Sequence, residues 1–157
     1  MRELGVAVGP IAVGPMREPL WPGGVVGSIT HCGSFWAATV ARRSHIRGLG
    51  VDAAVNRPLE PHVRELIVSS DEEAAWAERS SADAAWDVVL FSAKEAVFKA
   101  WWPARRQWLE FTDVAIALDD TTGNFAACIS LAAGETQTIS GHFTTCRGLV
   151  LTTAVMR

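Results

Sequence analysis

Two acids and two lysines stand out in this sequence because their surroundings favour chemistry. Asp52 lies in the apolar stretch 49–55, and Glu95 lies in an otherwise apolar helical pattern. An ionised carboxylate in such surroundings is costly unless it is hydrogen-bonded, paired or bound to a cation. Together the two acids could supply oxygen ligands to Mg²⁺, which binds proteins through one or two carboxylates, waters and substrate phosphates.

Lys94 and Lys99 are the only lysines of the chain, against twelve arginines. Lysine is a compact charge that can lose its proton when buried, whereas arginine cannot. The two lysines therefore indicate positions where arginine will not serve, and they suit a phosphate-bearing substrate near the metal. Simpler interpretations stay open: a chance distribution of lysines, an Asp52 that caps a turn at the end of a strand, and a Glu95 that forms an ordinary i, i+4 pair with Lys99.

The elements that must position these residues follow the order strands, helices, long helix, strands, which indicates an α+β fold. Residues 24–30 and 35–42 predict two strands with a tight connection, and residues 49–54 predict a third strand that carries Asp52. Two short helices are expected at 62–68 and 71–79, and four further strands at 112–118, 124–131, 136–145 and 149–155.

The longest periodic segment predicts a helix over 82–102, with Ser80 as a candidate N-cap and Pro103 as its stop. It has two largely apolar faces, one formed by Trp86, Leu90, Ala93, Val97 and Trp101 and the other by Phe91, Glu95, Phe98 and Trp102. A helix that is apolar on two faces is largely buried, so its charged residues need partners.

Composition narrows the class of protein. A chain of 157 residues with 49% hydrophobic residues predicts one domain with its own core, and a net charge of −3 argues against a nucleic-acid binder. Its three cysteines form no CxxC pair, which favours neither a disulfide framework nor a zinc site and indicates a reducing cytoplasm. The apolar run 4–13 is too short and too interrupted by glycine and proline to predict a membrane span.

Three segments carry a more specific signal. Residues 21–32 read WPGGVVGSITHC, residues 50–52 read GVD, and residues 91–101 read FSAKEAVFKAW. In this order they resemble the WP-x-G-x-x-GS-x-TH, G-[IV]-D and [FW]-[ST]-x-KE-A-x-x-K motifs of phosphopantetheinyl transferases of the enterobactin type. The resemblance covers most of the chain, from about residue 2 to the end.

The resemblance implies Mg²⁺-dependent transfer of 4′-phosphopantetheine from coenzyme A to a serine of an apo acyl or peptidyl carrier protein. The second product is adenosine 3′,5′-bisphosphate. By position, Asp52 and Glu95 would hold the metal, Glu95 would also accept the serine proton, and Lys99 would stabilise phosphate charge. Thr30 and His31 match residues that contact the ribose 3′-phosphate of the coenzyme. Arg17 is a weaker candidate for another phosphate.

The family fold consists of two similar α+β lobes about a pseudo-twofold axis, with the site between them. Applied to this chain, it predicts a single domain over 1–157, with a partial first lobe over about 1–60 and a second lobe over about 61–157. Typical members have a further helical segment before the stretch that begins here near residue 2. The first lobe is therefore expected to be incomplete, which would expose apolar surface over 25–40 and invite self-association.

One residue departs from the family pattern at a metal ligand. The motif continues G-[IV]-D-x-E, and Ala54 stands where the second carboxylate is expected, on the same face of the strand as Asp52. Two other interpretations therefore stay open. The chain could be a truncated or degenerate member that binds coenzyme A or a carrier protein without turnover, or a structural domain whose motifs are coincidental.

Overall fold

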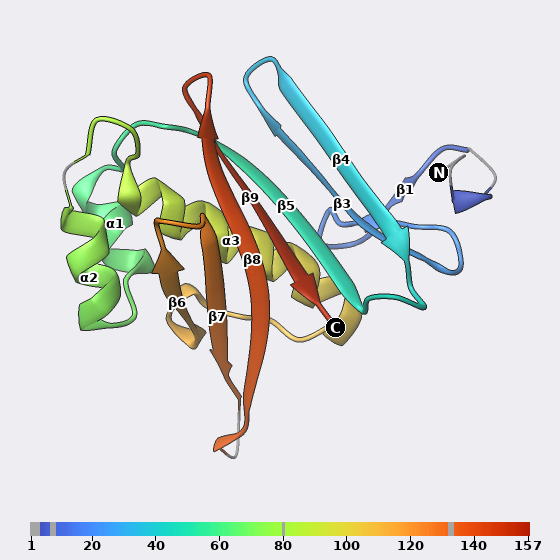
Figure 1. The fold of residues 1–157 in the computed structure, drawn as a ribbon. Helices are drawn as coiled ribbons and strands as arrows, with labels where there is room; N and C mark the ends of the chain where they lie inside the picture. The colour runs from blue at the N-terminus through green and yellow to red at the C-terminus, as the bar shows by residue number, and fades with distance from the viewer. Residues whose placement is uncertain (1–3, 7–8, 80, 132–133) are drawn as a thin grey trace.

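The computed structural model describes residues 4–6, 9–79, 81–131 and 134–157, and it confirms the α+β class (Figure 1). Its helices and strands, in chain order, are β1 (Ala12–Val13), β2 (Pro19–Leu20), β3 (Val25–Cys32), β4 (Phe35–Arg42), β5 (Gly48–Val55), α1 (Pro61–Ile67), α2 (Asp71–Glu78), α3 (Trp86–Arg105), β6 (Val114–Asp119), β7 (Asn124–Ser130), β8 (Thr136–Cys146) and β9 (Leu149–Met156). A 3₁₀ turn at Phe111–Asp113 precedes β6. Within the described residues, no helix has both the length and the apolar character that crossing a bilayer requires.

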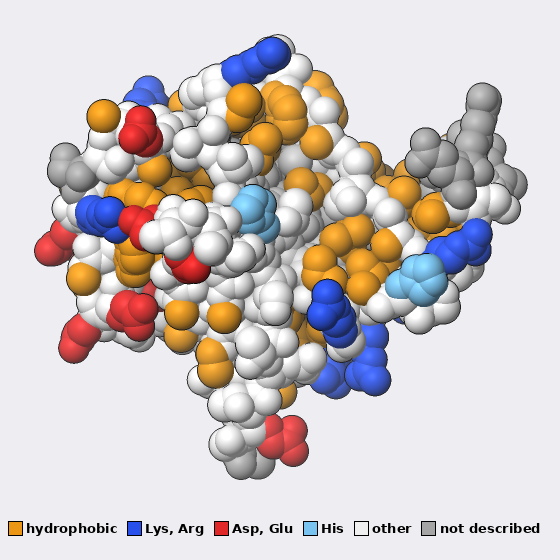
Figure 2. Space-filling model, in the orientation of Figure 1, with side chains coloured by type: hydrophobic (Ala, Val, Ile, Leu, Met, Phe, Trp, Pro, Cys, Tyr) orange, Lys and Arg blue, Asp and Glu red, His pale blue; other side chains and the backbone are white. Residues whose placement is uncertain are grey.

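β3 and β4 form the antiparallel hairpin that the sequence predicts. The pairing runs from Val25 opposite Arg42 to Cys32 opposite Phe35, and Gly33 makes the turn with a φ of 57°. A left-handed backbone in a two-residue hairpin turn is best supplied by glycine. The outer side of this hairpin is apolar in part, since Ile29 and Trp36 are exposed, and Figure 2 shows hydrophobic side chains along it.

The second sheet has five antiparallel strands in the order β5-β9-β8-β7-β6, with α3 packed against one face (Figure 1). Strand β5 lies at the edge of this sheet and also beside β3. β3 contacts β5 through side chains: the Thr30 hydroxyl accepts the Ala53 N–H at 3.1 Å, and the Ser28 hydroxyl donates to the Val51 carbonyl at 3.5 Å. β5 therefore joins the hairpin to the larger sheet.

Two glycines bring β5 and α3 unusually close. A Cβ atom built on Gly50 would lie 1.8 Å from the carbonyl oxygen of Ala96, and one built on Gly48 would lie 2.2 Å from that of Ala100. Both glycines share one face of the strand with Asp52, because side chains alternate along a strand. The absence of side chains at these two positions thus lets the strand bring Asp52 against the helix.

The predicted limits of the long helix are wrong at both ends. α3 begins at Trp86, because Asn56 holds the preceding segment in a non-helical form: its amide nitrogen donates to the Asp83 carbonyl at 2.9 Å and its amide oxygen accepts the Ala85 N–H at 2.8 Å. The proposed N-cap Ser80 lies outside the described residues. Pro103 does not stop the helix, which continues to Arg105. In the last turn, proline removes one hydrogen bond without preventing two further helical residues.

The core lies between α3 and the five-stranded sheet. The face of α3 predicted as fully apolar is buried there, and these residues are Trp86, Leu90, Ala93, Val97 and Trp101. The second face is only half-buried, and it presents Phe91, Glu95, Phe98 and Trp102. α3 is therefore anchored along one side and free to contribute to a cleft along the other.

Candidate active site

Asp52 is the centre at which three elements meet. This residue of β5 is 6% exposed, and its carboxylate accepts hydrogen bonds from the Lys99 ammonium at 2.6 Å and the Ser92 hydroxyl at 2.8 Å, both on α3. The Thr30 hydroxyl on β3 lies 3.4 Å from the same group. Asp52 stands in the middle of its strand, so the turn-cap interpretation of the sequence is wrong. The carboxylate is buried because it has a cation and hydroxyl donors around it.

Lys99 pairs across elements and not along its helix. Its ammonium, on a side chain that is 28% exposed, contacts Asp52 and the Val51 carbonyl at 3.3 Å. No ion pair or hydrogen bond to the Glu95 carboxylate is found among the described residues. The i, i+4 pairing that the sequence left open is therefore not the one that forms.

Glu95 is a half-buried carboxylate beside the Asp52–Lys99 pair. Burial raises the pKa of Glu95, the negative charge of Asp52 raises it further, and the positive charge of Lys99 offsets part of the rise. A buried acid close to a second acid is an environment in which an added cation is favourable. Glu95 is thus free to accept a proton or to bind a cation.

A cleft of about 440 Å³ opens over these groups. The N-terminal segment contributes Arg17, strand β3 contributes Ser28, and helix α3 contributes Glu95 and Lys99. Three of the residues that the sequence nominates for the site, Arg17, Glu95 and Lys99, therefore line one cavity. They come from positions as much as 82 residues apart by their numbering (99 − 17).

A second cavity, of about 250 Å³, adjoins the first. Its lining is mainly apolar, with Phe98, Trp108 and Phe111 among its side chains. Glu95 and Phe98 line both cavities, so the acid stands at the boundary between a polar cleft and an apolar pocket.

Lys94 is not brought into the cleft with Lys99, although both were predicted to contact phosphate. Its side chain is 1% exposed, and its ammonium donates to the Ile67 carbonyl at 2.6 Å, the Phe111 carbonyl at 2.9 Å and the Glu73 carboxylate at 2.9 Å. An ammonium group has three donors, and these oxygens occupy them. Burial lowers the pKa of Lys94, and Glu73 partly restores it. The Lys94 ammonium is therefore held by oxygens of the protein, although the residue lines the second cavity.

Glu73 was missed by sequence reasoning because a local pattern conceals it. Ser70 and Glu73 match the S-x-x-E capping box at the start of α2, and the Ser70 hydroxyl does accept the Glu73 N–H. The Glu73 carboxylate, however, is fully buried and accepts the Ile116 N–H at 2.7 Å as well as Lys94. It joins α2, α3 and β6 at one point.

Thr30 and His31 are neighbours with opposite surroundings. Thr30 is buried at the Asp52 centre, whereas His31 is exposed and packs on the Trp36 ring with a centroid separation of 4.6 Å. Alternation along β3 places the two side chains on opposite faces of the hairpin. The structure brings Thr30 to the Asp52 carboxylate and leaves His31 outside this centre.

Ala54 lies half-buried two residues beyond Asp52, packed against the hydrophobic core. In the part of the chain that the structure describes, no three acids, histidines or cysteines cluster as metal ligands. Two carboxylates still fit Mg²⁺, which takes waters and substrate phosphates for its other positions. The free Glu95 carboxylate beside the Asp52 charge is the feature of this structure that fits such a cation.

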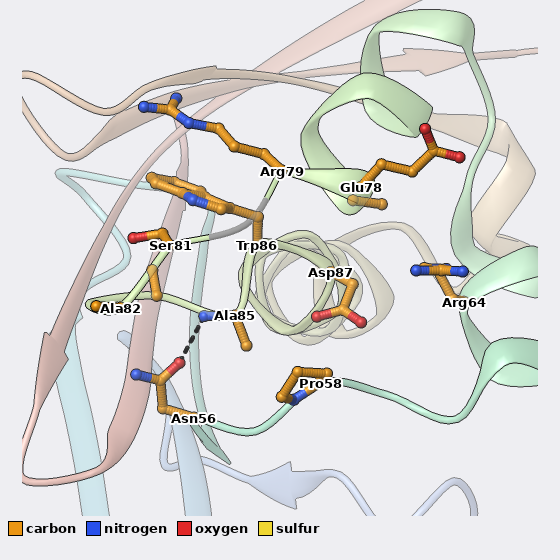
Figure 3. A pocket seen from close by; sticks show the side chains of 12 residues that line it. Asn56, Pro58, Arg64, Glu78, Arg79, Ser81, Ala82, Ala85, Trp86 and Asp87 are labelled. Carbon is orange, nitrogen blue, oxygen red and sulfur yellow. Dashed lines mark hydrogen bonds between the residues drawn. The ribbon is translucent and has the colours of Figure 1, made fainter.

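A third cavity, of about 280 Å³, lies at the beginning of α3 and shares no lining residue with the cleft. Figure 3 shows Asn56 bonded to Ala85 at its edge, with Asp87 and Arg64 on the opposite side. The Asp87 carboxylate accepts the Leu59 and Val88 N–H groups. The polar groups here fix the start of the helix.

Comparisons with known proteins agree with the motifs. The family model described as "4'-phosphopantetheinyl transferase superfamily" matches residues 48–154, and the one described as "4'-phosphopantetheinyl transferase N-terminal domain" matches residues 1–41.

Three curated relatives show how much of each protein is shared. 4'-phosphopantetheinyl transferase PptT of Mycobacterium tuberculosis is 39% identical over 98% of this chain and 72% of its own length. Svp of Streptomyces mobaraensis is 43% identical over 80% of the chain and 52% of its own length. Enterobactin synthase component D of Escherichia coli is 33% identical over 64% of the chain and 47% of its own length. The chain thus spans about half the length of the last two relatives. It belongs to the 4'-phosphopantetheinyl transferase superfamily.

Proposed function

We propose that this chain transfers 4′-phosphopantetheine from coenzyme A to a serine hydroxyl of an apo acyl or peptidyl carrier protein. The observation that carries the proposal is the convergence at one cleft of the free Glu95 carboxylate and Lys99, which pairs with the buried Asp52 carboxylate. The names of the relatives support it, since each is a phosphopantetheinyl transferase or a component of enterobactin synthase. The carrier could serve siderophore, polyketide or fatty-acid synthesis.

Asp52 and Glu95 would hold Mg²⁺ against the pyrophosphate of the coenzyme. When bound, the ion neutralises charge on the phosphates, which is a main contribution to catalysis of phosphoryl transfer. Lys99 and Arg17 add positive charge along the same cleft. The apolar pocket on the other side of Glu95 is suited to the phosphopantetheine arm, because it joins the cleft at the acid.

Glu95 is proposed as the general base. The serine oxygen forms a bond to the phosphorus nearer the pantetheine, the bridging bond of the pyrophosphate breaks, and adenosine 3′,5′-bisphosphate leaves with the bridging oxygen. The serine proton passes to the Glu95 carboxylate, directly or through water. Lys99 stabilises the charge that develops on the phosphate oxygens.

The test is to incubate the purified chain with coenzyme A, Mg²⁺ and an apo carrier protein, and to weigh the carrier by intact mass spectrometry. A mass gain of one phosphopantetheine is expected, and it should be absent without Mg²⁺ and with Glu95→Gln. Glu65→Gln is the matched control, since Glu65 is an exposed glutamate on α1. Unchanged turnover in Glu95→Gln would exclude Glu95 as the base.

Ala54 favours a second candidate, a family member that binds coenzyme A or a carrier protein without turnover. Loss of one expected carboxylate weakens a metal site that depends on few ligands. Calorimetric binding of coenzyme A together with no mass gain, in an assay where a full-length relative is active, would support this second function.

The proposed compartment is the cytoplasm. Cys32, Cys128 and Cys146 are all free thiols, which fits a reducing environment.

A further inference from the structure

Glu18 is a buried carboxylate at the edge of the cleft that the proposed chemistry does not use. It is 8% exposed, although it belongs to a short segment near the surface. Its carboxylate accepts the Met16 N–H at 2.9 Å and a hydrogen bond from the Arg106 guanidinium. Burying a charged acid and its cationic partner costs free energy of desolvation, so the position of this ion pair between distant segments needs a reason.

The chain folds tightly around this carboxylate. The Gly14 N–H donates to the Glu18 carbonyl at 2.8 Å, and the Arg17 N–H donates to the Gly14 carbonyl at 2.9 Å. A Cβ atom on residue 14 would lie 2.4 Å from the carboxyl carbon of Glu18, so glycine at this position lets the carboxylate take its present place. Arg17 has a φ of 63°, a left-handed conformation that is uncommon for arginine. The Glu18 side chain therefore forms the centre of the loop that displays Arg17.

Arg106 connects this loop to the catalytic helix. It follows the last turn of α3 in a left-handed conformation, with a φ of 54°, and its N–H donates to the Trp102 carbonyl at 2.9 Å. The ion pair joins residues 88 apart in the sequence. Within the N-terminal segment that contains Glu18, strand β1 pairs with strand β2, and each of these strands has only two residues. The Glu18–Arg106 pair is thus a main tie between the segment and the helix that carries Glu95 and Lys99.

The pair also controls the charge of the cleft. Glu18 and Lys99 line the same cavity, and an unpaired carboxylate there would repel the phosphates of a coenzyme. The Arg106 guanidinium neutralises Glu18, so that the free charge contributed by the loop is that of Arg17, which is exposed and lines the cavity.

We propose that Glu18 and Arg106 are a positioning pair, which holds Arg17 over the cleft and thereby sets the affinity for a substrate that carries several phosphates. The pair takes no part in bond making or breaking. The inference rests on the proposed function, because the loop that carries Arg17 would complete the phosphate-binding wall of the same cleft.

Kinetics with coenzyme A test the proposal. Glu18→Gln and Arg106→Gln should each raise KM for coenzyme A roughly tenfold, the effect of losing one charge-assisted contact, and leave kcat within about twofold. Arg17→Gln should do the same. The double variant Arg17→Gln/Glu18→Gln should be little worse than either single variant, because Glu18 acts through Arg17. Arg105→Gln is the matched control, because this substitution removes the same charge from the same turn. Arg105 bonds to Gln137 on β8 and not to Glu18. The KM of this control variant for coenzyme A should equal that of the parent.

Hydrogen exchange provides a readout that does not depend on turnover. Glu18→Gln should speed exchange of the amides in 14–18 and leave those of 93–99 unchanged. Unchanged exchange in 14–18, or an unchanged KM in an active enzyme, overturns the positioning role and leaves the proposed function standing. If the parent protein transfers nothing but Glu18→Gln speeds exchange in 14–18, the proposed function is wrong and the positioning role of the pair stands. If Glu18→Gln does not fold, Arg106→Gln serves both tests. The Arg106 side chain is half-exposed, so its replacement should not prevent folding.

Discussion

Ala54 lies on the same side of β5 as Asp52, so a carboxylate at position 54 would add negative charge on the side of the strand that carries Asp52. We expect Ala54→Glu to lower the Mg²⁺ concentration that gives half-maximal transfer by roughly tenfold, since one added inner contact typically changes metal affinity at least that much. Binding of Mn²⁺ to the free protein, followed by electron paramagnetic resonance, checks the same point without turnover.

The matched control for this change is Val55→Glu. Val55 is 54% exposed and lies on the opposite face of the strand. The Val55→Glu substitution therefore adds the same charge one residue further on, facing away from Asp52. Its Mg²⁺ dependence should be that of the parent. An Ala54→Glu variant with the same Mg²⁺ dependence would show that position 54 does not face the metal.

Lys94 gives a prediction about stability. Lys94→Met leaves the Glu73 carboxylate buried without its cation, which should lower the free energy of unfolding by about 3–5 kcal/mol. Urea denaturation measures this loss, and the double variant Glu73→Gln/Lys94→Met should recover part of it. KM for coenzyme A should not change. A raised KM with unaltered stability would restore the phosphate contact that the sequence predicted for Lys94.

The sequence showed that these charges need partners, but it could not name the partners. Asp52 pairs with Lys99 across 47 residues, and such a contact leaves no local pattern. The separation of Lys94 from Lys99, by contrast, can be read from a local pattern. Residues five apart on a helix point about 140° away from each other, so both lysines could not serve one cleft. That geometry was available from the spacing, and it would have removed Lys94 from the predicted site.

At the scale of elements, the close approach of β5 to α3 depends on two missing side chains. Gly50→Ala would place a Cβ atom 1.8 Å from the Ala96 carbonyl, against backbone that cannot move without displacing the helix. We expect the variant to lose about 3 kcal/mol or more of stability, and to lose transfer activity as Asp52 moves away from Lys99. Thermal unfolding followed by circular dichroism measures the first effect.

Gly23→Ala is the control for that substitution, because a Cβ atom at position 23 would have no neighbour within 4 Å. It should unfold as the parent does. A Gly50→Ala protein of parental stability would mean that α3 can shift without cost.

Element types were predictable from periodicity, and element ends were not. The hairpin, the two short helices and the last four strands lie within a few residues of their predicted limits, because each has a strong local pattern. The predicted start of α3 was wrong because residues 82–85 are compatible with a helix, and hydrogen bonds from Asn56, about 30 residues earlier, hold them in another conformation. Tertiary contacts override such weak local preferences.

At the scale of the whole molecule, the β3–β4 hairpin and the five-stranded sheet meet at β5. The hairpin contacts β5, and β5 is also an edge strand of the larger sheet and packs against α3. We therefore expect a single cooperative unfolding transition, as for one domain. Tryptophan fluorescence and far-ultraviolet circular dichroism should give the same urea midpoint. Two separate midpoints would show that the parts before and after about residue 60 are independent units.

The order of the larger sheet could not be read from the sequence. Its strands were predicted singly, yet β5 pairs with β9, a strand about 100 residues further on, with Gly50 opposite Ala154. Pairing of strands so distant depends on the whole fold and not on local propensity. The family resemblance supplied what local patterns did not, namely that a site lies between two parts of the chain.

The contrasting surroundings of the two lysines make the chain a convenient subject for covalent labelling. Reagents that acylate amines need access to the nitrogen, and the Lys94 nitrogen is sealed by oxygen acceptors while the Lys99 side chain opens to the cleft. Among side-chain amines, such a reagent would therefore mark Lys99 selectively. The extent of modification would then report whether the cleft is occupied, by mass alone and without a carrier protein.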